Sequence, residues 1–281
     1  MEKLSDETLL TLLEDTDSRS SLAAMQFMLK RGDLDAFVAA HQDEENPRLR
    51  RRIQQLHNVA RLRRQQAAFI EALDERSMTF WQAVRRLSLI YDQRYSEMAL
   101  DQKIEEFLNA SRMHQPSSEA LARLLLKKNF EPPRYNEMFQ LETFFLPEAL
   151  FSGCGQTLLL CALAKQVCQM NNWGGTIVLY SGKFMLQTPD GKILMPEERW
   201  EALRDRDATR FHICTDQELI HTYLAQIAAA CVVDDQPYDL CVFSRMMTTH
   251  CGGQVSDLPY PLGKLRQEGD DGFHVGGKGK K

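Results

Sequence analysis

The sequence has no long apolar run and no cysteine framework, and these absences exclude several classes of protein. Its two most apolar stretches, residues 150–164 and 219–233, are interrupted by polar residues or too short to span a bilayer as helices. The first ten residues lack the apolar segment after a basic start that a secretory signal needs. Seven cysteines, an odd number without short spacings, are typical of reduced thiols. We therefore expect a cytoplasmic protein that does not enter a membrane.

Motifs for metals and cofactors are also missing. The sequence contains no Cys-x-x-Cys, no His-x-x-x-His and no Gly-Lys-Ser/Thr motif. His212 with Cys214, and His250 with Cys251, have no further ligand at metal-binding spacing. A net charge of −5 does not indicate bulk affinity for nucleic acid. We predict no metal site and no cofactor.

Three cysteines, Cys154, Cys161 and Cys168, recur at every seventh position. On a helix, successive members lie about 10 Å apart along the axis. A single zinc ion needs each sulfur about 2.3 Å away, so this spacing excludes a shared metal. The spacing favours a stripe of small residues on a buried helix, with a reactive, exposed Cys154 as the lesser alternative.

The N-terminal half contains a succession of short amphipathic helical patterns. Ser5, Asp17, Asp33 and Asn46 each precede an apolar stripe and are predicted N-caps, and Pro47 stands at a first helical position. Residues 16–19 and 45–48 open two such patterns about thirty residues apart, which resembles a HEAT-type repeat. We predict an all-α, helical-repeat-like domain over residues 1–132.

The composition changes after the proline pair at 132–133. A strongly apolar helix is predicted over residues 157–168, followed by strands at 176–180, 183–187 and 193–194 joined by glycine- and proline-containing turns. A second buried helix is predicted over 218–231. Residues 240–243 fit either a strand or the start of a last helix. The fold class is therefore α+β, with a small domain containing a β-meander over 133–262.

The C-terminal residues 263–281 are dominated by glycine, aspartate and lysine. Such a composition cannot bury enough apolar surface to order a chain. We predict a disordered tail.

Residues 151–165, with 176–180 and 182–189, resemble the core of the transglutaminase-like superfamily. Phe-Ser-Gly-Cys-Gly-Gln-Thr leads into a buried helix ending Ala-Leu-Ala-Lys, and Gly-Lys-Phe-Met-Leu-Gln-Thr-Pro follows the first strand. Helical repeats before such a core resemble the Sir-B-type bacterial branch. The resemblance implies a cysteine nucleophile at the helix N-terminus, a histidine base and an orienting aspartate, although that branch often lacks the nucleophile.

Matched residue by residue, the implied catalytic positions hold other residues. An ungapped match places Gly153 at the nucleophile position and Cys154 one residue late, although a one-residue gap restores Cys154. The histidine position falls near Gly174 or Gly175, and the aspartate position falls on Thr188. Glycine cannot act as a base, and threonine carries no charge to stabilise an imidazolium. The resemblance therefore implies a catalytically inactive member, or pseudoenzyme.

Two enzymatic or binding alternatives stay open beside that interpretation. One is a cysteine hydrolase or transamidase that uses Cys154 with a distant His212 or His250. The other is a nucleic-acid-associated scaffold that uses the arginines of residues 48–64.

Seven arginines between positions 48 and 64 form the strongest charge cluster. These positions spread around a helix axis with one aromatic residue nearby, Phe69, which disfavours a nucleic-acid footprint. An acidic stretch over residues 33–45 precedes them, so local ion pairs on a solvated face are expected. We predict a non-catalytic protein-interaction module with an unidentified protein partner. Its proposed surface is Arg48, Arg51, Arg52 and Arg63.

Overall fold

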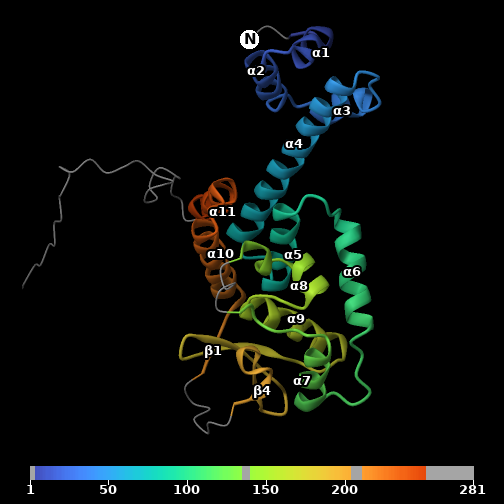
Figure 1. The fold of residues 1–281 in the computed structure, drawn as a ribbon. Helices are drawn as coiled ribbons and strands as arrows, with labels where there is room; N and C mark the ends of the chain where they lie inside the picture. Colours follow the sequence, from blue (N-terminus) through green and yellow to red (C-terminus); the bar gives the residue numbers. More distant parts are fainter. Residues whose placement is uncertain (1–3, 135–139, 204–210, 251–281) are drawn as a thin grey trace, which may run out of the picture. The chain divides into compact units, whose positions relative to one another are not determined.

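The structure is a computed structural model that describes residues 4–134, 140–203 and 211–250 (Figure 1). An all-helical N-terminal region is followed by an α+β region with one small antiparallel sheet, which confirms the predicted fold class. The chain forms two compact units, residues 1–110 and residues 111–281. They are called the first unit and the second unit below, and each is described by itself.

Six helices make up the described part of the first unit. They are α1 (Asp6–Glu14), α2 (Ser18–Met28), α3 (Leu34–His41), α4 (Pro47–Asp74), α5 (Phe80–Tyr91) and α6 (Glu97–Asn109). Ser5, Asp17 and Asn46 cap α1, α2 and α4 with their side chains, as predicted. The predicted side-chain cap at Asp33 is wrong, because its carboxylate instead pairs with Arg31, 2.6 Å from Nη2.

The first four helices share one apolar core. Leu13 of α1, Met28 of α2, Phe37 of α3 and Leu56 of α4 are buried in the same cluster. Figure 1 shows α1, α2 and α3 gathered around the N-terminal end of α4. The rest of α4 continues without a break and contacts α5. The HEAT-type repeat stays a prediction.

The second unit places helices around a small sheet. Its described elements are α7 (Ser118–Lys127), η2 (Leu141–Phe144), α8 (Leu146–Ser152), α9 (Thr157–Met170), β1 (Thr176–Tyr180), β2 (Lys183–Gln187), β3 (Ile193–Met195), η3 (Pro196–Glu198), β4 (Glu201–Ala202), β5 (His212–Ile213), α10 (Asp216–Val233) and α11 (Pro237–His250). Residues 240–243, for which strand and helix were both open, belong to α11.

The sheet has the strand order β4-β3-β2-β1-β5, with every pairing antiparallel. The run from β1 to β4 is therefore the predicted meander. Leu186 of β2 faces Ile177 of β1 and Leu194 of β3, and α9 packs against β1 and β2. Nine of the fourteen residues of α9 are buried, which explains its nearly continuous apolar sequence.

The two units divide before α7, whereas the sequence placed α7 in the helical domain that ends at residue 132. Two contacts explain this difference. α7 packs against α9, and the hydroxyl of Ser118 donates to Asp190 Oδ2 at 2.8 Å. A contact between residues so far apart in sequence leaves no sign in the composition. The predicted tail, residues 263–281, lies outside the described residues.

Candidate functional site

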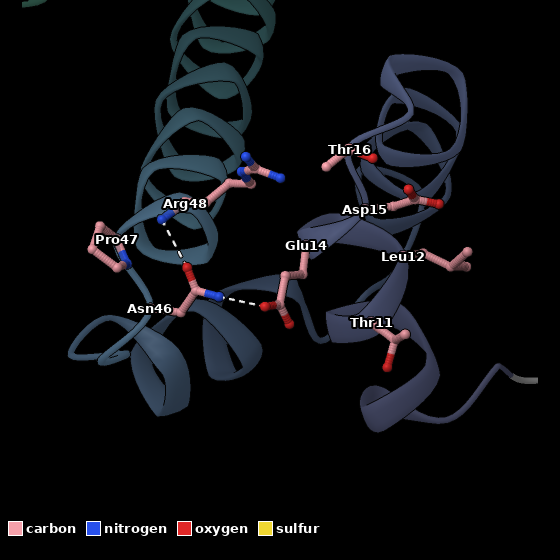
Figure 2. A pocket seen from close by; sticks show the side chains of 8 residues that line it. All are labelled: Thr11, Leu12, Glu14, Asp15, Thr16, Asn46, Pro47 and Arg48. Carbon is pink, nitrogen blue, oxygen red and sulfur yellow. Dashed lines mark hydrogen bonds between the residues drawn. The ribbon is translucent and has the colours of Figure 1, made fainter.

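Two adjoining surface cavities lie in the first unit, where the turn between α1 and α2 approaches the start of α4. The first, which we name the arginine pocket, has a volume of about 420 Å³. Its lining residues are Asp15, Thr16, Arg48, Arg51, Arg52 and Gln55. The second, which we name the acidic pocket, has a volume of about 780 Å³. Figure 2 shows its lining residues, Thr11, Leu12, Glu14, Asp15, Thr16, Asn46, Pro47 and Arg48.

Asn46 joins the two sides of the acidic pocket. Its Oδ1 accepts the backbone N–H of Arg48 at 3.0 Å, and its Nδ2 donates to Glu14 Oε1 at 2.5 Å (Figure 2). One side chain thus caps α4 and holds the last residue of α1 beside it. Pro47 has no N–H, and the N–H of Arg48 already donates to Asn46. A ligand here would therefore be bound by side chains and not by the backbone N–H groups at the start of α4.

The acidic residues of the α1–α2 turn are engaged with the backbone. Asp15 Oδ1 accepts the N–H of Asp17 at 2.9 Å, and Asp17 Oδ1 accepts the N–H of Arg19 at 3.0 Å as the cap of α2. These hydrogen bonds fix the turn that forms one wall of both pockets. Arg48 extends from the opposite wall toward Asp15 and Thr16 (Figure 2).

The arginine pocket has one helical face of α4 as its other wall. Arg48, Arg51, Arg52 and Gln55 follow a spacing of three and four residues, which places their side chains on one side of a helix. Arg52 Nη1 lies 3.4 Å from Gln55 Oε1, a neutral partner. Within the described residues, none of the three guanidinium groups forms an ion pair with a carboxylate. The lining therefore carries three guanidinium groups against the one carboxylate of Asp15, so it is net positive.

The other arginines of α4 behave differently. Arg64 forms an ion pair with Asp35 of α3, and Arg61 Nη2 donates to the carbonyl of Gln93 at 2.8 Å. Arg63 is exposed and lines neither pocket. Of the four arginines predicted to form one interaction surface, the structure brings together Arg48, Arg51 and Arg52. The predicted ion pairing with the acidic stretch occurs at Arg64 and not at these three.

In the second unit, Cys154 stands between α8 and α9 and is partly exposed. It precedes α9 by three residues, so it does not belong to the first turn of the helix. Its N–H donates to Ser152 Oγ at 3.0 Å, and its backbone pairs with Glu131. The preceding Gly153 has φ +80°, and a Cβ there would approach the carbonyl oxygen of Asn129 to 2.5 Å. Only glycine fits that position.

The two histidines named as partners for Cys154 lie on other elements. His212 is in β5, and its Nε2 lies 3.0 Å from Glu218 Oε1. Glu218 Oε2 also accepts the N–H of Thr215 at 2.8 Å, which closes the capping box of α10. Hydrogen bonds from Thr215 and then His212 hold the pKa of Glu218 below its usual range. His250 ends α11, and its side chain lies outside the described part of the chain.

The other positions implied by the resemblance serve packing and turns. A Cβ on Gly175 would lie 3.5 Å from Cys168 Sγ, so this glycine packs on the C-terminal part of α9. Thr188 is buried, and its Oγ1 lies 2.6 Å from Asp190 Oδ1. Burial raises the pKa of the Cys168 thiol to about 12 and that of Cys161 further still. A thiol with a raised pKa is a poor nucleophile at neutral pH.

A small polar group that the sequence did not predict lies at the start of α9. Thr157 Oγ1 is 3.4 Å from Glu197 Oε1, and Lys183 Nζ is 2.8 Å from Glu197 Oε2. We name Thr157, Lys183 and Glu197 the α9 cluster. The hydrogen bond to Glu197 raises the pKa of Lys183, so the lysine stays charged and paired. Its members come from α9, β2 and η3, so no sequence periodicity indicates it.

Within residues 4–134, 140–203 and 211–250, no group of three His, Cys, Asp or Glu side chains has the geometry to hold a metal ion. A search of the same described residues found no helix with the length and apolar character needed to cross a bilayer. Comparison with known proteins found no matching family model, no similar curated protein and no similar solved structure.

Proposed function

We propose that this protein is a non-catalytic protein-binding module whose binding surface is the arginine pocket of the first unit. The observation that supports the proposal is the convergence of Arg48, Arg51 and Arg52 without a carboxylate partner among the described residues. Like charges held together on one helix face destabilise the free protein slightly, and a bound carboxylate removes that repulsion. Arginine is also the charged residue most enriched at the centres of protein interfaces.

For the second unit, we propose a transglutaminase-like scaffold that no longer catalyses. Three observations support the loss of catalysis: Cys154 precedes α9 instead of starting it, Gly175 packs against Cys168, and Thr188 is bound into a turn. None of these positions supplies a base or an acid beside a thiol. Such a unit contributes a folded platform, and binding specificity resides in the first unit.

The proposal is tested by identifying a partner from a lysate of the source cell and reconstituting the complex from purified proteins. Replacing Arg51 by Glu should weaken the reconstituted complex by about thirtyfold, equivalent to about 2 kcal/mol, because an interface arginine becomes a repelling charge. The matched control is Arg63→Glu, which makes the same charge change on the same helix outside the pocket. It should stay within about twofold. Equal losses for both variants would contradict the assignment of the surface.

The catalytic alternative, with Cys154 as nucleophile and His212 or His250 as base, has its own test. The rate of alkylation of Cys154 is measured across pH, with Cys154→Ser as the blank. An inactive site predicts that the rate rises only as pH approaches the ordinary thiol pKa, about 8.5. A depressed pKa together with peptide amidase or transamidase turnover would establish the enzyme instead.

A further inference from the structure

The two pockets form one continuous surface with opposite charge at its ends. They share Asp15, Thr16 and Arg48. Beyond these shared residues, one end carries Arg51 and Arg52, and the other end carries Glu14. The lining of the arginine pocket is therefore net positive, and the lining of the acidic pocket is net negative. A ligand that covers both must change sign along its length.

Resting on the proposed function, we infer that the bound part of the partner is an extended peptide segment of mixed charge, with carboxylates over Arg48, Arg51 and Arg52 and a basic residue over Glu14 and Asp15. The order of the charges on the surface fixes which end of the segment lies over which pocket. Each guanidinium can bind a carboxylate through two parallel N–H···O bonds, so the positive end selects carboxylates by geometry as well as by charge.

The helix spacing also sets the spacing of the carboxylates. Arg48 and Arg52 are four residues apart on α4, which separates them by about 6 Å along the axis. In an extended strand, side chains on the same side recur every second residue, about 6.6 Å apart. Acidic residues at alternate positions of the segment therefore match the arginine row.

The lining favours a peptide over a nucleic acid for two reasons. A phosphate chain carries negative charge along its whole length, and it would bring that charge to Glu14 and Asp15 at the acidic end. Neither pocket has an aromatic lining residue on which a base could stack. Thr16 and Gln55 offer a hydroxyl and an amide that suit the polar backbone of a peptide.

The experiment measures the fluorescence anisotropy of labelled synthetic peptides on the full chain. The first probe has one lysine followed by glutamates at alternate positions, the second has the same residues with the lysine in the middle of the glutamates, and the third has glutamine in place of the lysine. A short single-stranded DNA of similar negative charge is the fourth. The first peptide should bind about tenfold more tightly than any of the other three, because only it places a positive charge over the acidic pocket and carboxylates over the arginine pocket.

Variants at each end assign the two charges. Arg52→Glu should abolish measurable binding of the first peptide, whereas Arg63→Glu should leave its dissociation constant within about twofold. Asp15→Asn, which keeps an oxygen for the N–H of Asp17, should reduce the preference for the lysine-containing peptide over its glutamine version at least threefold, about 0.7 kcal/mol.

Each contrary result overturns the inference in a different way. Equal binding of the first and second peptides would exclude a separation of charge along the segment, and tighter binding of the DNA would replace the peptide by a nucleic acid. If no peptide changes the anisotropy, the mixed-charge segment is wrong. The proposed function is judged separately by the reconstituted complex and its Arg51→Glu variant, so the two can fail independently.

Discussion

Arg51 of α4 and Lys183 of β2 are both exposed basic side chains, yet their surroundings differ. Arg51 shares its pocket with two more arginines and has no carboxylate partner among the described residues. Lys183 lies 2.8 Å from Glu197, which also reaches Thr157. The arginine pocket thus keeps charge available for a ligand, whereas the α9 cluster has neutralised its own. The two sites therefore differ in whether their basic side chains form ion pairs with described carboxylates.

If this comparison is right, substitutions in the second unit should change stability, and substitutions in the arginine pocket should change binding alone. The largest effect on stability is expected for Gly153→Ala. It combines a left-handed backbone at φ +80° with a 2.5 Å approach of the new Cβ to the carbonyl of Asn129, so the free energy of unfolding should fall by about 3 kcal/mol or more. Urea denaturation measures the loss.

Gly182→Ala is the matched control for this substitution. Gly182 has a similar φ of +77° but nothing within 4 Å of a Cβ, so the cost should be about 1 kcal/mol, from the backbone alone. Equal losses at both glycines would show that the clash between a Cβ at position 153 and the carbonyl of Asn129 adds nothing to the backbone cost.

Asp190→Ala should cost about 2 kcal/mol, because the buried Ser118 and Thr188 lose their hydrogen bonds to its carboxylate. Burial disfavours the charged form of Asp190, but hydrogen bonds from Thr188 and Ser118 outweigh it and hold the pKa below its usual range. The folded-state pKa is therefore the lower one. The stabilisation is complete above the unfolded pKa of about 4 and disappears as the pH falls through the folded value.

Denaturation curves of wild-type protein and Asp190→Ala at several pH values measure this effect. The two should converge in acid and differ at neutral pH. Asp190→Asn, which keeps an acceptor oxygen, should lie between them. A constant difference at every pH would mean that the charge of Asp190 plays no part.

A smaller effect is expected in the α9 cluster. Lys183 and Glu197 are both partly exposed, so solvent screens their attraction. A double-mutant cycle with Lys183→Met and Glu197→Gln should give a coupling free energy of about 0.5 kcal/mol or less. A coupling above about 1.5 kcal/mol would show that this pair is a stronger structural element than its exposure suggests.

The smallest effect is expected for Arg51→Gln. Because Arg51 is exposed and forms no ion pair with a described carboxylate, its removal should change the free energy of unfolding by no more than about 0.5 kcal/mol. The direction should be stabilising at low salt, where removing one of three like charges matters most. A loss of unfolding free energy above about 1 kcal/mol would show that Arg51 stabilises the fold. It would contradict the contrast drawn between the arginine pocket and the α9 cluster.

Local signals in the sequence were sufficient for most helices and strands. Ser5 and Asn46 cap the helices they precede, and the β-branched and apolar run from Thr176 is a strand, since caps and periodicity act between near neighbours. The end of the first unit was not predictable in this way. It depends on the contact between Ser118 and Asp190, which no local pattern encodes.

The candidate site was predicted in part. The arginine cluster is visible as a composition, and its members at positions 48, 51 and 52 have helix-face spacing. The sequence could not show that Arg64 is paired with Asp35 while Arg51 is not, because pairing depends on where α3 packs against α4. The wall formed by Asp15 and Thr16 was likewise missed, since it comes from a turn about thirty residues away.

The length of α4 has a mechanical consequence. Its 28 residues extend about 42 Å as a single helix, whose first turns line the arginine pocket and whose later turns contact α5. No loop interrupts it that could absorb a displacement. A pull applied by a partner held at Arg51 is therefore carried by one continuous ladder of backbone hydrogen bonds. In a stretching experiment, α4 should transmit the pulling force along its length until successive turns unwind.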